Sequence, residues 1–232
     1  MLQQTQASRV VESYRKFIDR FPDPGSLATA ANAEVLSSWM GLGYNTRALR
    51  LKEAARIIEE RGWPTTSIEL RSLPGVGPYT AAAVACFAFG EQTAAIDTNL
   101  RRVLSRWVGR PLDGADLIST AGELLADGAA IDWNQAVMDL GATICRPSPD
   151  CAACPVTDWC EDPGIYERPR PQGRFEGSVR QTRGAILRTL LEEDRVGIDD
   201  LRELSPHVDE AVADLVDEGV VVLNEDRVSL KP

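Results

Sequence analysis

The chain has few lysines and few aromatic residues, and it contains no long apolar run. Its lysines are Lys16, Lys52 and Lys231, and Phe, Trp and Tyr make up 6% of its 232 residues. No segment approaches the ~18 consecutive apolar residues of a membrane-spanning helix, and residues 1–6 lack the basic and apolar regions of a signal peptide. Because 44% of the residues are hydrophobic and spread along the chain, we predict a globular protein. We expect it to be cytoplasmic, with no membrane partner.

The net charge of −10 is unevenly distributed. Residues 1–150 carry 15 Lys and Arg against 17 Asp and Glu, and residues 151–183 carry five of each. Residues 184–232 carry five basic against 13 acidic side chains. Most of the acidity therefore belongs to the C-terminal segment, and the nearly neutral remainder can still present local basic patches to nucleic acid.

One glycine-rich segment, Leu73-Pro-Gly-Val-Gly-Pro-Tyr-Thr80, separates two helix-like runs at 45–61 and 78–89. Glycine allows the backbone to adopt positive φ and to approach a ligand closely. A proline at the first helical position marks a helix start, whose unpaired amides attract phosphate. The segment therefore predicts either an anion site between two helices or an ordinary turn with no ligand.

Apolar residues recur at three- and four-residue steps over most of the chain, which predicts an all-α body. The expected helices cover 5–21, 26–42 as two helices, 45–61, 78–89, 98–108, 116–125 and 133–145. Beyond residue 183, three short helices at 180–191, 198–204 and 208–217 precede a β-hairpin at 220–230, which is a winged-helix pattern. The acidic residues of the 208–217 helix would be repelled by phosphate, so protein packing is the better assignment for it.

Four of the five cysteines lie within sixteen residues. They are Cys145, Cys151, Cys154 and Cys160, separated by five, two and five residues. Thiolates this close together in a loop can surround one metal centre, and the spacing alone suits an iron–sulfur cluster or tetrahedral zinc equally well. Disulfides are disfavoured in a cytosolic protein. Cys86 lies in an apolar helix and is expected to be a buried structural thiol.

Five sequence segments and the four late cysteines give the chain a family resemblance. The segments 73–80 and Ile96-Asp-Thr-Asn-Leu-Arg-Arg-Val103, with the four late cysteines, resemble the helix–hairpin–helix DNA glycosylases that include endonuclease III. The segments Met1-Leu-Gln-Gln-Thr-Gln6, Gly41-Leu-Gly-Tyr44 and Trp133-Asn-Gln-Ala-Val-Met-Asp-Leu-Gly141 narrow the resemblance to the A/G-specific adenine glycosylases, the MutY family. The resemblance covers about residues 1–165.

The resemblance implies a base-flipping enzyme that must hold the DNA backbone firmly. The backbone of Gly75, Val76 and Gly77 would bind a phosphate of double-stranded DNA beside the lesion. Asp97 would be the catalytic carboxylate that stabilises an oxocarbenium-like transition state, although Asp97 also suits the N-cap of the next helix. Asn99 would support that carboxylate or the neighbouring backbone.

The residue after the hairpin separates two chemistries. Family members that also cut the strand use a lysine there to form a Schiff base, and this chain has Tyr79. The resemblance therefore implies a monofunctional glycosylase, with Tyr79 in the base pocket and Gln135 at the adenine edge. Gln4 and Thr5 would contact the stack beside the opposing 8-oxoguanine. Each of these polar side chains could instead be a helix-end or surface group.

The chain departs from the family pattern in two places. The family's general-acid glutamate lies two residues before the segment that here begins at Met1, so we expect that either the start codon is internal to a longer gene or the chain is a DNA-binding remnant. Without that acid, base release would lose about 10²–10⁴-fold in rate. Between Cys145 and Cys151 there are five residues where the family has six, a difference that a proline-rich loop can absorb. A [4Fe–4S] cluster is therefore still favoured, with zinc as the alternative.

We predict four segments: a helical glycosylase body at 1–144, a cysteine loop at 145–165, an arginine-rich linker at 166–183 and an acidic winged-helix-like domain at 184–232. The linker arginines either follow phosphates or are simply solvated. The family's larger, Nudix-like C-terminal domain has no counterpart in this sequence. The predicted function is removal of adenine opposite 8-oxoguanine or G by a monomeric enzyme. The alternatives are a T/G mismatch glycosylase and a non-catalytic Fe–S protein that binds mismatched DNA.

Overall fold

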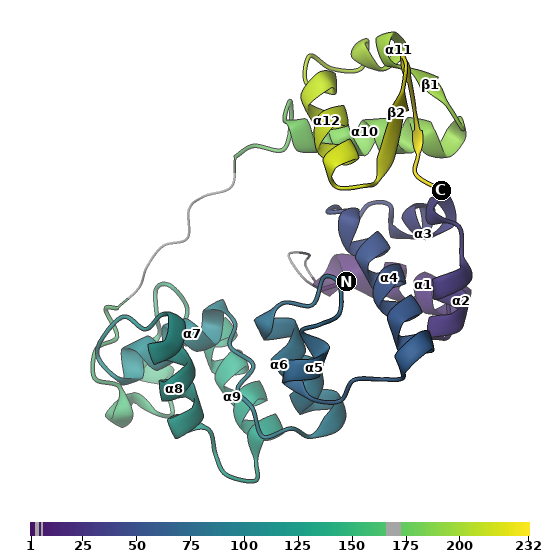
Figure 1. Cartoon of the computed structure of the whole chain (residues 1–232). Coiled ribbons are helices and arrows are strands. Elements are labelled where there is room, and N and C mark those ends of the chain that lie inside the picture. Colours follow the sequence, from purple (N-terminus) through teal and green to yellow (C-terminus); the bar gives the residue numbers. More distant parts are fainter. Residues whose placement is uncertain (3–4, 6, 166–172) are drawn as a thin grey trace. The chain divides into compact units, whose positions relative to one another are not determined.

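The structure is a computed structural model that describes residues 1–2, 5, 7–165 and 173–232 (Figure 1). The chain divides into two units, one of Met1–Trp63 with Gln172–Pro232 and one of Pro64–Pro171. Helices predominate in both units, as the sequence predicted. Within the described ranges, no helix is long and apolar enough to cross a membrane. The four predicted segment boundaries stay a prediction.

The first part of the first unit is a group of four helices. They are α1 (Ala7–Arg20), α2 (Pro24–Thr29), α3 (Asn32–Trp39) and α4 (Thr46–Arg61). Asp23 begins α2 by accepting a hydrogen bond from the amide of Ser26 at 2.7 Å. The buried ring of Phe17 on α1 meets the buried indole of Trp39 on α3 edge to face, with the ring centroids 5.8 Å apart. This aromatic contact holds α1 against α3. The separate helices α2 and α3 confirm the predicted break of 26–42 into two helices.

The last part of the first unit combines helices with a small sheet. Its elements are α10 (Val179–Glu192), β1 (Val196–Gly197), α11 (Ile198–Arg202), α12 (Val208–Asp217), β2 (Val221–Asn224) and β3 (Arg227–Leu230). The strands form an antiparallel sheet in the order β1-β3-β2. The hairpin of β2 and β3 was predicted, and the strand β1 was not, because two residues are too few to show an alternating pattern. The chain is therefore mostly helical and not purely so.

The second unit holds five helices and the cysteine loop. Its elements are α5 (Ser67–Leu70), α6 (Pro78–Phe89), α7 (Thr98–Trp107), α8 (Gly114–Leu124), α9 (Ala130–Thr143) and the two short 3₁₀ turns Cys151–Ala153 and Thr157–Trp159. Fully buried Leu100 and Leu104 of α7 pack with Leu112, Ala121 and Val137 in one apolar cluster. This cluster fixes α7 against α8 and α9 and so positions the residues at the start of α7.

One prediction about the hairpin was wrong. The sequence assigned the run 45–61 as the first of its two helices, and in the structure the hairpin follows the separate one-turn helix α5. Thr66 begins α5, because its side chain accepts from the amide of Glu69 while Glu69 accepts from the amide of Thr66. This Thr-x-x-Glu capping box was legible in the sequence, but four residues are too few to show a helical period.

Candidate functional site

A tight turn joins α5 to α6. The amide of Val76 donates to the carbonyl of Leu73 at 3.2 Å, with Pro74 and Gly75 at the two central positions. Gly75 has a φ of +77°, the left-handed conformation that the second central residue of a type II turn requires. Proline suits the first central position and glycine the second, which explains the order of this pair.

The helix α6 begins directly after this turn, with Gly77 as its N-cap and Pro78 as its first residue. A methyl group in place of the Gly77 hydrogen would meet no atom within 4 Å, so the backbone here is open to a ligand. The first amides of a helix have no partner within it. Because the amide of Val76 is already used in the turn, Gly77 and the first turn of α6 supply the donors that a phosphate would meet.

Asp97 is the N-cap of α7, and both of its carboxylate oxygens accept hydrogen bonds. The Oδ1 atom accepts from the amide of Leu100 at 2.7 Å, and the Oδ2 atom accepts from the Nδ2 atom of Asn99 at 3.0 Å. Burial, and then the negative charge of Asp97, raises the pKa of Tyr79. Tyr79, which is 41% exposed, therefore lies within electrostatic reach of the carboxylate. The structure thus brings together three of the predicted site residues.

Asn99 is held in turn by Arg102, a residue that the sequence analysis did not select. The Nη2 atom of Arg102 donates to the Oδ1 atom of Asn99 at 2.9 Å and to the carbonyl of Gly141 at 2.7 Å. The Nε atom of Arg102 donates to the carbonyl of Cys145 at 2.8 Å. Because Oδ1 of Asn99 faces a guanidinium, its Nδ2 atom faces Asp97, and the amide has one favourable orientation.

Gly141 on α9 lets α9 approach α7 closely at this point. A Cβ atom at Gly141 would lie 2.7 Å from the Cβ atom of Asn99 and 3.4 Å from its Cα and O atoms. Contacts below 3 Å are repulsive, and part of this contact is with backbone, which yields less than a side chain does. The absence of a side chain at Gly141, the last residue of the 133–141 motif, therefore leaves the space that Asn99 occupies.

Asn134 is a second residue that the sequence analysis missed. Its side chain is fully buried, and its Oδ1 atom accepts from the amide of Ala95 at 2.7 Å. Its Nδ2 atom donates to the carbonyls of Thr93 and Ala130 at 2.9 and 2.8 Å and to the sulfur of Cys86 at 3.4 Å. Asn134 thus fixes the segment that leads into Asp97. Cys86 is fully buried, as predicted, and burial raises the pKa of its thiol.

The remaining predicted contacts to the base and the lesion are those of Gln135, Thr5 and Gln4. Gln135 is exposed on α9, where its Nε2 atom donates to the Oδ1 atom of Asp139 at 3.0 Å. Thr5 belongs to the other unit, where its hydroxyl donates to the carbonyl of Leu42 at 3.3 Å. Gln4 lies outside the described residues. The roles of these three side chains stay predictions.

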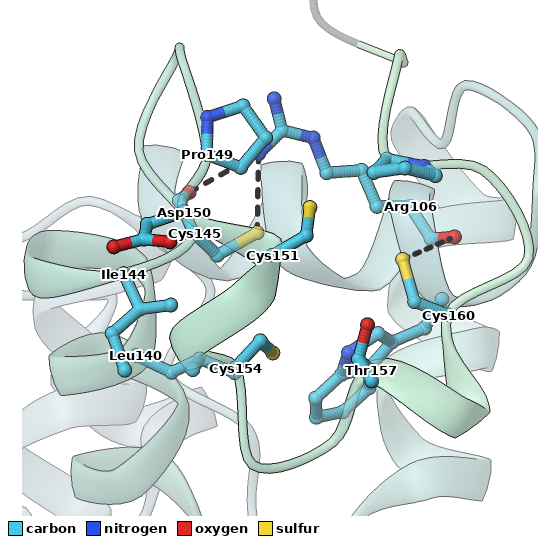
Figure 2. A pocket seen from close by; sticks show the side chains of 12 residues that line it. Arg106, Leu140, Ile144, Cys145, Pro149, Asp150, Cys151, Cys154, Thr157 and Cys160 are labelled. Carbon is cyan, nitrogen blue, oxygen red and sulfur yellow. Dashed lines mark hydrogen bonds between the residues drawn. The ribbon is translucent and has the colours of Figure 1, made fainter.

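The four late cysteines line a single pocket, and their sulfur atoms face its interior (Figure 2). Cys145 is buried, while Cys151, Cys154 and Cys160 are partly exposed. Burial, and then the negative charges of the other three cysteines, raises the pKa of Cys160, while Arg106 lowers it. All four thiols therefore lie within electrostatic reach of one another, as the spacing in the sequence predicted.

Arg106 is the centre of this loop, and only 1% of it is exposed. Its Nη1 atom donates to the sulfur of Cys145 at 3.1 Å and to the carbonyl of Arg146 at 2.8 Å. Its Nη2 atom donates to the carbonyl of Pro147 at 3.1 Å, and its Nε atom donates to the carbonyl of Ile165 at 3.0 Å. A buried guanidinium with at least one acceptor for each nitrogen explains how a loop with little regular structure keeps its shape.

The pocket has the donor set of a metal centre but not the arrangement of a single-ion site. In the part of the chain that the structure describes, no group of three or more His, Cys, Asp or Glu side chains is placed to hold one metal ion. A zinc ion at about 2.3 Å from each sulfur would draw the four sulfurs to about 4 Å from one another.

Residues 1–124 match a family described as HhH-GPD superfamily base excision DNA repair protein. The adenine DNA glycosylase of Mycobacterium tuberculosis is 41% identical over 208 residues, which cover 82% of this chain and 67% of that protein. The adenine DNA glycosylase of Homo sapiens is 44% identical over 174 residues, which cover 69% of this chain and 31% of that protein. The chain therefore spans two thirds of the mycobacterial relative and about a third of the human one.

Solved structures of two kinds are similar to this chain. A thermostable thymine-DNA glycosylase matches with a TM-score of 0.65 and 33% identity, covering 69% of this chain and 78% of that one. A trapped covalent endonuclease III–DNA intermediate matches with a TM-score of 0.63 over 70% of this chain and 79% of that one, and its 22% identity makes this a likeness of fold. The chain belongs to the HhH-GPD superfamily of base excision DNA repair proteins, and within it to the family of the adenine DNA glycosylases.

Proposed function

We propose that the protein is a monofunctional DNA N-glycosylase that hydrolyses the bond between adenine and deoxyribose where adenine is mispaired with 8-oxoguanine or G. The observation that carries the proposal is the carboxylate of Asp97, fixed at the start of α7 by the amide of Leu100 and the side chain of Asn99. It lies twenty residues after the second glycine of the hairpin and within electrostatic reach of Tyr79. The relatives named adenine DNA glycosylase support the choice of reaction.

In this reaction the bond between C1′ of the sugar and the base nitrogen breaks, and its electron pair leaves with the base. Positive charge develops on the sugar, and a water molecule then adds its oxygen to C1′ and loses a proton, while the departing base nitrogen gains one. A carboxylate fixed beside the sugar stabilises that charge without having to reorganise. Asp97 suits this role because two hydrogen bonds fix its orientation before the substrate binds.

Tyr79 favours hydrolysis over strand cleavage. A strand-cleaving glycosylase needs an amine nucleophile that forms a Schiff base with C1′. Among the residues of the hairpin and the first turn of α6 there is no lysine, and Tyr79 occupies the position next to the catalytic carboxylate. We therefore expect an intact abasic site as the product.

Two bases are candidates for release by this site, adenine as the first and thymine as the second. The 33% identical structural relative named thymine-DNA glycosylase supports thymine as the second candidate. Gln135 favours adenine, because a carboxamide can donate and accept at the same time and so can pair with the N6 and N7 atoms of adenine. Its present partner, Asp139, is exposed and can be exchanged for the base at little cost.

We assign the phosphate contact to the hairpin between α5 and α6. Gly77 is exposed, a Cβ placed on it would meet no atom within 4 Å, and the left-handed Gly75 forms the turn that precedes it. Amides at a helix start attract phosphate through their partial positive charge. This contact is independent of base sequence, so it would hold the duplex while the base is being flipped.

We propose that the four-cysteine pocket holds a [4Fe–4S] cluster, with zinc as the alternative. Cys145, Cys151, Cys154 and Cys160 would be its ligands, and Arg106 would donate to the sulfur of Cys145. Such a cluster is held by four cysteine thiolates, and four cysteines line this one pocket. Iron and sulfide analysis of anaerobically purified protein, with its visible absorption, separates the two groups, and one zinc per chain would refute the cluster.

We propose a winged-helix-like architecture for residues 173–232, with α12 in the place of a recognition helix. The acids of α12 are largely paired within the domain: Arg183 contacts Asp214 and Glu218, and Arg202 contacts Asp209. A helix whose charged groups are acidic and engaged in this way is unsuited to a DNA groove. We assign this face to contact with protein.

The proposed function is tested by single-turnover base release from duplexes that carry one A·8-oxoguanine, A·G or G·T pair. Adenine release from the first two duplexes, with no strand cleavage until alkali is added, is the expected result. Release of thymine alone would establish the second candidate. Binding to all three duplexes without release of any base would refute the proposal of catalysis.

A further inference from the structure

The start of α5 is fixed by a carboxylate that belongs to the far end of α6. The Oε2 atom of Glu91 accepts from the amide of Ser67 at 2.6 Å, and its Oε1 atom accepts from the hydroxyl of Ser67, also at 2.6 Å. Both bonds are short and partly buried, and they join residues 24 positions apart. Hydrogen bonds to an ionised carboxylate are about twice as strong as neutral ones.

The position of Glu91 is itself closely defined. Gly90 ends α6 in the left-handed conformation with a φ of +73°, and its amide donates to the carbonyl of Cys86 at 3.0 Å. The amide of Glu91 donates to the carbonyl of Ala85 at 2.9 Å. Together with the left-handed Gly90, these two bonds fix the direction of the chain as it leaves α6. Glu91 is therefore presented to α5 by the helix end and not by a freely moving loop.

The helix α5 needs such support because it has only four residues. One turn of helix gains too little from its own hydrogen bonds to offset the cost of nucleation. Glu69 accepts from the amides of Thr65 and Thr66, both at 3.2 Å, and Glu91 accepts from the next amide, that of Ser67. Two carboxylates thus satisfy three successive amides at the start of α5.

We propose that Glu91 is a positioning residue for DNA binding, which closes the helix–hairpin–helix motif at the end opposite to the hairpin. The turn at 73–76 joins the end of α5 to the start of α6, and the pair Ser67–Glu91 joins the start of α5 to the end of α6. With both ends joined, α5 cannot rotate away from α6, and the amide of Gly77 keeps its direction. This role rests on the proposed phosphate contact at the hairpin.

The test compares Glu91→Ala, Ser67→Ala and the double variant with the wild type, using the full chain. The measurements are the Kd for a duplex carrying an A·8-oxoguanine pair, the base-release rate at saturating DNA and hydrogen exchange of residues 65–77. If the unlinked motif keeps its binding geometry about a tenth of the time, the Kd for Glu91→Ala rises about tenfold. The rate at saturating DNA stays unchanged, because Glu91 takes no part in the chemistry.

Two further variants make the test specific. Ser67→Thr keeps both the amide and a hydroxyl and is expected to bind DNA like the wild type. Glu123→Ala removes a comparable pair on α8, where the hydroxyl of Ser119 donates to the Oε1 atom of Glu123 at 3.0 Å, and is expected to change nothing. The effects of Glu91→Ala and Ser67→Ala are expected to be less than additive in the double variant, because they break the same contact.

The outcomes separate this inference from the function on which it rests. Faster exchange at 65–77 together with a raised Kd supports the positioning role. Faster hydrogen exchange at 65–77 with an unchanged Kd overturns the positioning role. Unchanged hydrogen exchange overturns it as well. A wild-type protein that binds no duplex refutes the proposed phosphate contact and the DNA role of Glu91 with it, while the exchange data still decide whether Glu91 secures α5.

Discussion

Asp97 caps α7 and is proposed to be the catalytic carboxylate, and the substitution Asp97→Asn separates these two roles. As an N-cap it needs one side-chain oxygen for the amide of Leu100, which Asn supplies equally well. As a catalytic carboxylate it needs negative charge, which Asn lacks. In the wild type the Nδ2 atom of Asn99 donates to Asp97. In the variant the new amide nitrogen would face this donor, so one hydrogen bond is lost at a cost of about 1 kcal/mol.

The expected loss of rate follows from the charge. A carboxylate about 4 Å from the charge that develops on the sugar contributes about 4 kcal/mol at the effective dielectric constant of about 20 that applies near a protein surface. Since about 1.4 kcal/mol corresponds to a factor of ten in rate, Asp97→Asn should release adenine about 10³-fold more slowly. The free energy of unfolding should fall by no more than about 1 kcal/mol.

The assay is single-turnover release of adenine at saturating enzyme, with thermal unfolding measured on the same preparations. Asp113→Asn is the matched control, because Asp113 is the N-cap of α8 and accepts from the amide of Gly114 at 2.9 Å. It should change neither rate nor stability appreciably. A rate for Asp97→Asn within a few-fold of the wild type would show that Asp97 is only a cap, and equal losses in both variants would point to a general effect of removing charge.

Two further pairs of substitutions test the surroundings of the site. Gly141→Ala should destabilise the protein by about 1–3 kcal/mol and slow base release, because its Cβ would lie 2.7 Å from that of Asn99. Gly122→Ala, in the middle of α8 with no atom within 4 Å of its Cβ, should instead stabilise by up to about 1 kcal/mol in thermal unfolding. Gly75→Ala should raise the Kd for duplex DNA, because its φ of +77° is unfavourable for alanine, whereas Gly77→Ala should preserve the turn. Equal effects within either pair would contradict the steric argument.

The sequence predicted the long helices well and the short elements poorly. Helices such as α1 and α7 repeat an apolar face over several turns, so their type and approximate bounds could be read directly. The helix α5 and the strand β1 have four and two residues, and such elements are stabilised by partners distant in sequence. For α5 that partner is Glu91, and for β1 it is Val228 of β3.

The same distinction applies to the candidate site. Asp97 and Tyr79 belong to contiguous motifs, so the sequence could select them, and the four cysteines were marked by their spacing. Arg102 and Asn134 lie in two of the quoted motifs but were given no role, because an arginine and an asparagine on helices are usually exposed. Their importance depends on which carbonyls and amides the fold brings to them, and no local pattern encodes that.

The hydrogen bonds around Asn99 make the orientation of Asp97 depend on the cysteine loop. The carbonyl of Cys145 holds the Nε atom of Arg102, and Arg102 holds the Oδ1 atom of Asn99, whose Nδ2 atom donates to Asp97. Each link is a bond to an ionised or strongly polar group in a partly buried setting, where an unmade bond costs about 1–3 kcal/mol. If the backbone at Cys145 moves, Arg102 cannot follow it without disturbing Asn99, because the Nη2 atom of Arg102 donates to Asn99 and to the carbonyl of Gly141. The orientation of the Asp97 carboxylate therefore depends on the backbone conformation of the cysteine loop.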